Sequence, residues 1–227
     1  MKALVTGASG QLGRALATSA PDGVALVALG RRDLDIGDGG AVRAVIERER
    51  PDVVLNAAAY TAVDKAESEC EAAFRINAEG PGHLAAAAAA VGAAFVHVTT
   101  DFVFDGTKGT PYAPDDATAP LGAYGESKRD GEVAVLAAHG GALVVRTAWV
   151  YAAEGTNFAR TMLRLMRERG QVGVVADQIG TPTHAASLAR APRASTTSRT
   201  RAWPPGTTLR WPLPRRRRRS GCWIQPR

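Results

Sequence analysis

The stretch KALVTGASGQLG, residues 2–13, decides the fold. Its first part, residues 2–6, is a short run of apolar and β-branched residues that predicts a strand, and a helical pattern begins directly after the glycines. Glycines between a strand and a helix let the backbone approach a bound group, and the free N–H groups at the helix start attract an anion. In this context the turn predicts a dinucleotide site, with a plain glycine-rich turn as the alternative. The cofactor-binding residues expected here are Gly7, Gly10, Gln11, Leu12 and Gly13.

The rest of the first 191 residues alternates between strand and helix patterns. Such alternation predicts an α/β fold with a doubly wound, Rossmann-like parallel sheet, and places ligands at the carboxyl ends of the strands. An alanine-rich helical region after the third strand is expected to be interrupted at EGPGH, residues 79–83. The further strands expected are 24–29, 52–56, 94–98, 142–146 and 172–175, and the helices are 40–50, about 124–138 and about 157–169.

Composition excludes several classes of protein. No stretch approaches the ~20 apolar residues of a membrane span, and the N-terminus does not have the pattern of a signal peptide. Cys70 and Cys222 lie far apart and offer neither a disulfide framework nor a metal-binding spacing, so no metal site is expected. These features predict a cytoplasmic protein of one α/β domain, alone or with part of a second.

The charge of +6 comes entirely from the tail. Residues 192–227 contain ten arginines and no acidic residue, so the first 191 residues hold 18 basic and 22 acidic residues, a net charge of −4. The tail shows neither helical nor strand periodicity and has too few large apolar residues for a core. We therefore expect a dinucleotide-binding domain over 1–191 and a disordered tail over 192–227.

The end of the second strand, GRRDLDI (30–36), bears on the cofactor. An acidic residue there usually holds the ribose 2′-hydroxyl of NAD, whereas arginine accommodates a 2′-phosphate. Arg31 and Arg32 therefore favour NADPH, with NADH as a second possibility and a solvated basic turn as the alternative. Asp35 and Ile36 are expected to flank the adenine, unless Asp35 only caps a turn.

Two further strand ends carry candidate residues. After the third strand, the small Ala57, Ala58 and Ala59 would let a cofactor lie against the strand end, although alanines also pack helices on sheets. The cofactor-binding residues expected there are Ala58, Ala59 and Tyr60. The fourth strand ends in Thr99 and Thr100, whose hydroxyls can hydrogen-bond a substrate carbonyl at the edge of the sheet. The alternative is that they satisfy backbone groups.

The stretch AYGESKRDGE (123–132) places Tyr124 and Lys128 four residues apart. On a helix these side chains share one face. A phenol beside an ammonium is either an incidental surface pair or a proton-transfer device, because a nearby positive charge lowers the pKa of the phenol.

Taken together, TGASGQLG, RPDVVLNAAAYTAVDKAESE, TTDFVFDG, YGESKRDGE, RTAWVYAAEGTNFARTML and VVADQIGTPT resemble the extended short-chain dehydrogenase/reductase superfamily. Within it the chain is similar to the dTDP-4-dehydrorhamnose reductase family, over residues 1 to about 190. The resemblance implies that Thr100, Tyr124 and Lys128 are catalytic and that Asp101 and Trp149 contact the sugar. It also implies NADPH-dependent reduction of the C4 carbonyl of dTDP-4-dehydro-L-rhamnose to dTDP-L-rhamnose, with Lys128 gripping the nicotinamide ribose.

The tail departs from this pattern, because family members continue with helices and strands that complete a substrate lobe. A change of reading frame near residue 191 would explain the arginine-rich and proline-rich composition. A non-catalytic regulatory subunit, like the β subunit of methionine adenosyltransferase, is the alternative function. The run PRRRRRS would attract phosphate non-specifically, but the acidic remainder offers no supporting basic face, so no specific nucleic-acid partner is expected.

Overall fold

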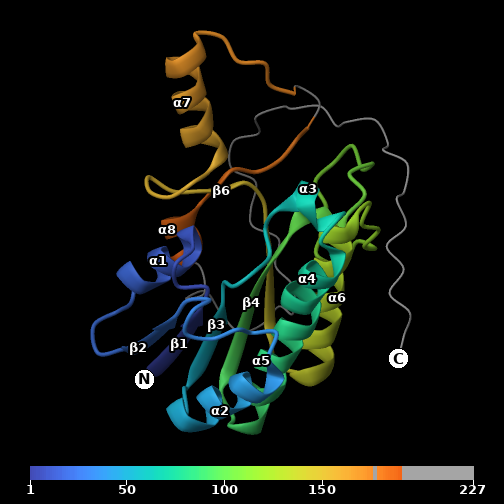
Figure 1. Ribbon diagram of the computed structural model, residues 1–227. Helices are drawn as coiled ribbons and strands as arrows, with labels where there is room; N and C mark the ends of the chain where they lie inside the picture. The colour runs from blue at the N-terminus through green and yellow to red at the C-terminus, as the bar shows by residue number, and fades with distance from the viewer. Residues whose placement is uncertain (176–177, 191–227) are drawn as a thin grey trace.

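The computed structural model describes residues 1–175 and 178–190, and the tail predicted over 192–227 lies outside this range. Five parallel strands form one sheet in the order β2-β1-β3-β4-β5 (Figure 1). This order confirms the predicted Rossmann-like α/β fold. The strands are β1 (Lys2–Thr6), β2 (Ala25–Leu29), β3 (Val53–Asn56), β4 (Ala94–Thr100) and β5 (Leu143–Thr147).

Helices cover both faces of the sheet (Figure 1). One face carries α1 (Gln11–Thr18), which packs against α8 (Ala185–Arg190). The other carries α2 (Gly39–Glu49), α5 (Gly80–Ala90) and α6 (Ala123–Ala138), with α5 lying between the other two. The shorter helices are α3 (Val63–Ala66), α4 (Cys70–Phe74) and the 3₁₀ turn η2 (Asp101–Val103), and α7 (Phe158–Arg169) projects away from the sheet.

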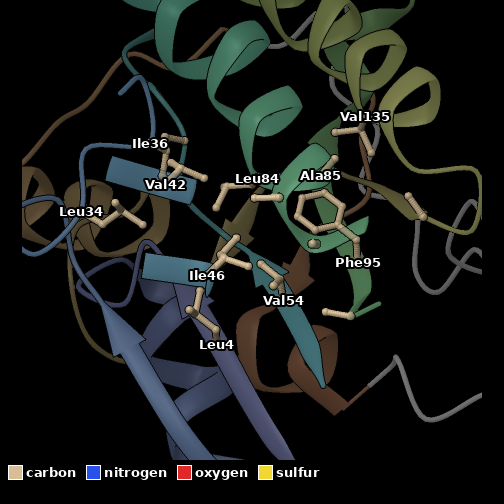
Figure 2. Close-up of a cluster of buried hydrophobic side chains, with 14 of the residues drawn as sticks. Leu4, Leu34, Ile36, Val42, Ile46, Val54, Leu84, Ala85, Phe95 and Val135 are labelled. Atoms are coloured by element: carbon tan, nitrogen blue, oxygen red, sulfur yellow. The ribbon is translucent and has the colours of Figure 1, made fainter. Parts of the chain in front are cut away.

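The core lies between the sheet and the α2, α5 and α6 layer. Figure 2 shows Leu4, Val54 and Phe95 from the strands meeting Leu84 of α5 and Val135 of α6. These side chains are at most 1% exposed. The apolar residues that predicted the central strands therefore pack the helices against the sheet. This packing fixes the position of the carboxyl edge of the sheet, where the polar residues lie.

The prediction of a strand over 172–175 is wrong, because those residues form no regular secondary structure. Gly173 interrupts the run and Val175 is 59% exposed, so the segment has no buried face with which to join a sheet. The small second sheet is instead formed by β6 (Val150–Tyr151) and β7 (Thr183–His184), which pair in parallel.

The interruption predicted at EGPGH is also wrong. A π-helical turn, η1 (Arg75–Glu79), carries the chain from α4 directly into α5. Gly131 of α6 lies against this turn so closely that a Cβ there would come within 2.0 Å of the Asn77 carbonyl oxygen. Proline is tolerated in the first turn that follows, where its missing N–H costs nothing.

Within residues 1–175 and 178–190, no helix combines the length and the apolar character that crossing a bilayer requires.

Candidate active site

The glycine turn after β1 forms a tight cradle. Gly7 has φ +70°, and a Cβ there would lie 2.6 Å from the Ala57 carbonyl. A Cβ on Gly13 would come within 2.2 Å of the Gly7 oxygen. Gly10 caps α1 without any side-chain hydrogen bond, so no side chain competes for the first N–H groups of the helix. A close approach of backbone and a helix start without a side-chain cap fit an anionic pyrophosphate group.

Gln11 and Leu12, which open α1, are both half-buried. The Gln11 side chain has a partner that the sequence did not reveal: its Oε1 accepts a hydrogen bond of 3.0 Å from Asn157 Nδ2. Asn157 also caps α7 by accepting from the Arg160 N–H at 3.1 Å. The start of α7 is thus tied to the glycine turn.

In the loop after β2, the four residues predicted to contact the cofactor lie in different environments. Arg31 and Arg32 are exposed. Asp35 forms an ion pair of 2.9 Å with Arg75 of η1, a partner that sequence reasoning missed. Burial acts to raise the pKa of Asp35, but the hydrogen bonds from Arg75 and the Gly37 N–H outweigh it, so the pKa is lowered. The Ile36 side chain lies in the hydrophobic core and packs against Gly80.

A buried polar row crosses three strands just below the carboxyl edge. Thr6, Asn56 and His97 are in register on β1, β3 and β4. Asn56 Oδ1 accepts from Thr6 Oγ1 at 2.7 Å and from the Ala58 N–H at 3.1 Å, so its amide nitrogen donates to His97 Nδ1 at 3.0 Å. Burial, reinforced by the charge of Lys128, holds the pKa of His97 well below its ordinary value. His97 is therefore neutral, with its proton on Nε2.

The segment after β3 is joined to α6 through one buried amide. Ala58, Ala59 and Tyr60 are half-buried. The Tyr60 N–H donates to Asn77 Oδ1 at 2.8 Å, and Asn77 Nδ2 donates to the Tyr60 carbonyl at 3.0 Å and to Ser127 Oγ at 3.1 Å. Asn77, on the π-helical turn, thus fixes the segment beside the residue that precedes Lys128.

The end of β4 presents a hydroxyl and a carboxyl group. Thr100 Oγ1 donates to Asp101 Oδ1 at 3.0 Å and accepts from the Phe102 N–H at 3.2 Å. Burial raises the pKa of Asp101, and the hydrogen bond from Thr100 partly offsets this. Thr99 Oγ1 is buried and has no hydrogen-bond partner among the described residues.

Tyr124 and Lys128 lie on consecutive turns of α6 and face this strand end. Lys128 is 2% exposed, and its Nζ donates to the Val98 carbonyl at 3.0 Å. The Tyr124 ring meets the Phe102 ring edge-on, with centroids 5.6 Å apart. The alternative of an incidental surface pair is therefore excluded.

The predicted lowering of the phenol pKa is wrong for this structure. Burial raises the pKa of Tyr124 to about 12, in spite of a hydrogen bond with Thr100 and with a further increase from the charge of Asp101. Burial also lowers the pKa of Lys128 to about 8, while the charge of Glu132 raises it. The physical reason is that burial disfavours the charged form of both groups and that the ammonium is directed at the Val98 carbonyl. Tyr124 consequently keeps its proton at neutral pH.

Trp149 lies between β5 and β6 with φ +47°, a left-handed conformation that is uncommon for a large side chain. Its carbonyl accepts from the Thr183 N–H at 3.2 Å, and its ring lies against Gly180, where a Cβ would be 2.6 Å from Cε2. The small sheet thus holds Trp149 at the carboxyl end of β5.

Residues 1–207 match the protein family described as the RmlD substrate binding domain. The chain belongs to this family. A curated RmlD relative, dTDP-4-dehydrorhamnose reductase of Burkholderia thailandensis, is 53% identical over 189 residues, which are 83% of this chain and 63% of the relative. The chain therefore spans less than two thirds of the length of that relative.

Two solved structures of RmlD-like proteins support the same assignment. A dTDP-4-dehydrorhamnose reductase from Clostridium acetobutylicum is 44% identical, with a TM-score of 0.83 and coverage of 85% of this chain and 69% of that one. The corresponding reductase from Bacillus anthracis, solved in complex with NADP, is 36% identical, with a TM-score of 0.87 and coverage of 92% and 76%. None of these relatives is a methionine adenosyltransferase subunit, so the regulatory alternative finds no support.

Proposed function

We propose that this chain uses NADPH to reduce the C4 carbonyl of dTDP-4-dehydro-L-rhamnose, forming dTDP-L-rhamnose. The observation that carries the proposal is the meeting of Thr100, Tyr124 and a buried Lys128 at the end of β4, on the same sheet edge as the glycine cradle. The names of the relatives, all dTDP-4-dehydrorhamnose reductases, support the substrate. The NADP in the Bacillus anthracis structure supports the cofactor.

The cofactor would be held along the carboxyl edge of the sheet. When bound, NADPH supplies the hydride for the reduction. The turn of Gly7, Gly10 and Gly13 fits its pyrophosphate, because the glycines let the turn pack closely on Ala57 and α1 and the N-cap Gly10 leaves the first N–H groups of α1 without a side-chain hydrogen bond. The exposed Arg31 and Arg32 would bind the 2′-phosphate. The remaining cofactor contacts that we propose are at Gln11, Leu12, Asp35, the backbone of Ile36, Ala58, Ala59, Tyr60, Tyr124 and Lys128.

The chain's own residues would orient the substrate and supply the proton. Thr100 Oγ1 would donate a hydrogen bond to the C4 carbonyl, and Asp101 and Trp149 would orient the sugar. Tyr124 would donate its Oη proton to the oxygen that gains negative charge during reduction, since a pKa of about 12 keeps the phenol protonated beforehand. Lys128, when cationic, would grip the ribose hydroxyls and stabilise the phenolate that remains.

The extent of the functional unit is part of the proposal. We retain residues 1–191 as the dinucleotide-binding domain and 192–227 as a separate tail, and the cytoplasm as the place of action. The purified 227-residue chain provides the test: NADPH binding is followed by cofactor fluorescence, and NADPH oxidation is followed after addition of dTDP-4-dehydro-L-rhamnose. Binding with turnover is the expected result. Binding without turnover would refute the reductase activity of this chain, and the absence of both would also refute the cofactor site.

A further inference from the structure

The catalytic face of α6 continues one turn beyond Lys128. Tyr124, Lys128 and Glu132 follow one another at intervals of four residues, so they line up along the same side of the helix. Glu132 is 5% exposed and Lys128 is 2% exposed. Two opposite charges are therefore buried on neighbouring turns, although neither the cofactor nor the substrate role proposed above uses Glu132.

Arg146 of β5 holds the Glu132 carboxylate in a two-pronged ion pair. Its Nε lies 3.1 and 3.2 Å from the two carboxylate oxygens, and its Nη2 lies 2.7 Å from Oε2. The remaining nitrogen, Nη1, donates to the Pro114 carbonyl at 3.0 Å, and the guanidinium lies 4.9 Å from the centre of the Phe104 ring. Since Arg146 is in register with Thr99 on β4, the pair joins the catalytic strand end, α6 and the loop before α6.

We propose that Glu132, fixed by Arg146, is a positioning residue that acts through Lys128 by keeping its ammonium charged beneath Tyr124. This inference rests on the proposed function only for its kinetic consequence. The electrostatic part concerns Lys128 itself and holds for the chain whether or not it turns over substrate.

Among the groups around Lys128, Glu132 carries the negative charge that stabilises the ammonium. Burial favours the neutral amine, and Glu132 is the group whose charge opposes this. On β4, His97 is neutral and contributes no negative charge. Asp101 of η2 acts on Tyr124, and Glu67, directly after α3, accepts from the N–H of Ala123, the first residue of α6 and the one before Tyr124. Arg146 is bound to Glu132 itself and fixes the position of its carboxylate.

The test is a direct titration of Lys128 by NMR in protein labelled on its lysine side chains. The sequence contains only four lysines, so Lys128→Met identifies the relevant signal by its loss. Glu132→Gln removes the charge and keeps the shape. We expect it to lower the pKa of Lys128 by about 1 unit, a shift typical of losing a nearby opposite charge. Asp130→Asn is the matched control, because it removes one acidic charge from an ion pair on the half-exposed side of α6 and should leave the titration unchanged.

A second variant keeps the test decisive if Glu132→Gln alone does not fold. Glu132→Gln/Arg146→Met removes both buried charges and leaves neither unpaired, so it should fold and show the same lowered pKa. Glu132→Asp keeps the charge and should restore a titration close to that of the wild type. If either folded variant that lacks the Glu132 charge titrates like the wild type, the proposal is overturned.

The kinetic consequence separates this proposal from the proposed function. In Glu132→Gln, the alkaline fall of NADPH oxidation should move to lower pH together with the Lys128 titration, while the rate at lower pH stays close to that of the wild type. A general loss of rate at every pH would indicate a merely structural role and would contradict the proposal. If the wild type shows no turnover, the reductase function fails, and the NMR titration still decides the role of Glu132.

Discussion

At the scale of the single residue, Tyr124 is the group that would deliver the proton. Its phenol is held edge-on against Phe102 and has a pKa of about 12. Tyr124→Phe keeps the ring and removes the proton, so we expect kcat to fall by about 10²–10⁴-fold while NADPH binding is unchanged. The control is Tyr151→Phe, which alters a 40% exposed tyrosine of β6 and should keep wild-type activity. Full activity in Tyr124→Phe would remove Tyr124 from the mechanism.

The burial of Lys128 lowers the free energy of unfolding of the chain by an amount that depends on pH. Its folded-state pKa of about 8 lies below the ordinary 10.5, so the unfolded chain binds more protons between these values and stability rises with pH there. Lys128→Met removes the penalty. We expect it to stabilise the chain by on the order of 3 kcal/mol near neutral pH, with the gain shrinking as pH rises from 8 towards 10.5.

Urea unfolding of the wild type and of Lys128→Met, at about pH 7 and about pH 9.5, measures this difference. The Tyr124 phenol stays protonated at both pH values in both folded proteins, so its contribution cancels in the comparison. A gain in free energy of unfolding that is the same at both pH values would contradict a buried, titrating lysine.

The candidate catalytic residues could be named from sequence, but their supports could not. Thr100, Tyr124 and Lys128 stand in short motifs whose spacing is local. Asn77 meets Tyr60 and Ser127, and Arg146 meets Glu132, across 14 to 50 positions of the chain. Such pairs depend on strand register and on helix packing, which no local pattern encodes.

At the scale of the element, the turn from β1 into α1 depends on glycine at residue 13. A Cβ there would lie 2.2 Å from the Gly7 oxygen and 2.6 Å from the Ala8 Cα, both in backbone that cannot move aside easily. We expect Gly13→Ala to lower the free energy of unfolding by about 1–3 kcal/mol and to weaken NADPH binding by about tenfold or more.

Gly140→Ala is the matched control for this change, because nothing lies within 4 Å of the added Cβ. Its thermal midpoint and its cofactor fluorescence titration should match those of the wild type. If Gly13→Ala bound NADPH as tightly as the control, the glycine turn would not be the pyrophosphate site.

Element prediction succeeded where buried apolar runs marked a strand and failed where burial was absent. The runs that became β1, β3 and β4 supply Leu4, Val54 and Phe95 to one core. The run at 172–175 is likewise rich in valine, but it contains Gly173 and leaves Val175 exposed, so its valines suggested a strand that packing does not support. At residues 79–83, glycine and proline suggested a break, whereas the π-helical turn η1 runs without a gap into α5, whose first turn contains Gly80 and Pro81.

At the scale of the whole molecule, the parallel sheet collects residues from distant parts of the chain at one edge. The glycine cradle follows β1, Thr100 ends β4, and Tyr124 and Lys128 come from α6. Strand and helix alternation predicted this arrangement, because parallel strands all end at the same edge. The match covers 63% of the length of the Burkholderia thailandensis relative, so turnover by this chain is the property to measure.

The most direct measurement uses NADPH deuterated at the transferable position of the nicotinamide. The 227-residue chain is incubated with this cofactor and dTDP-4-dehydro-L-rhamnose, and the nucleotide sugar is analysed by mass spectrometry and NMR. Our account predicts one deuterium at C4 of the sugar for the wild type and labelling about 10²–10⁴-fold slower for Tyr124→Phe. A wild-type chain that binds NADPH but leaves the sugar nucleotide unlabelled would contradict the account.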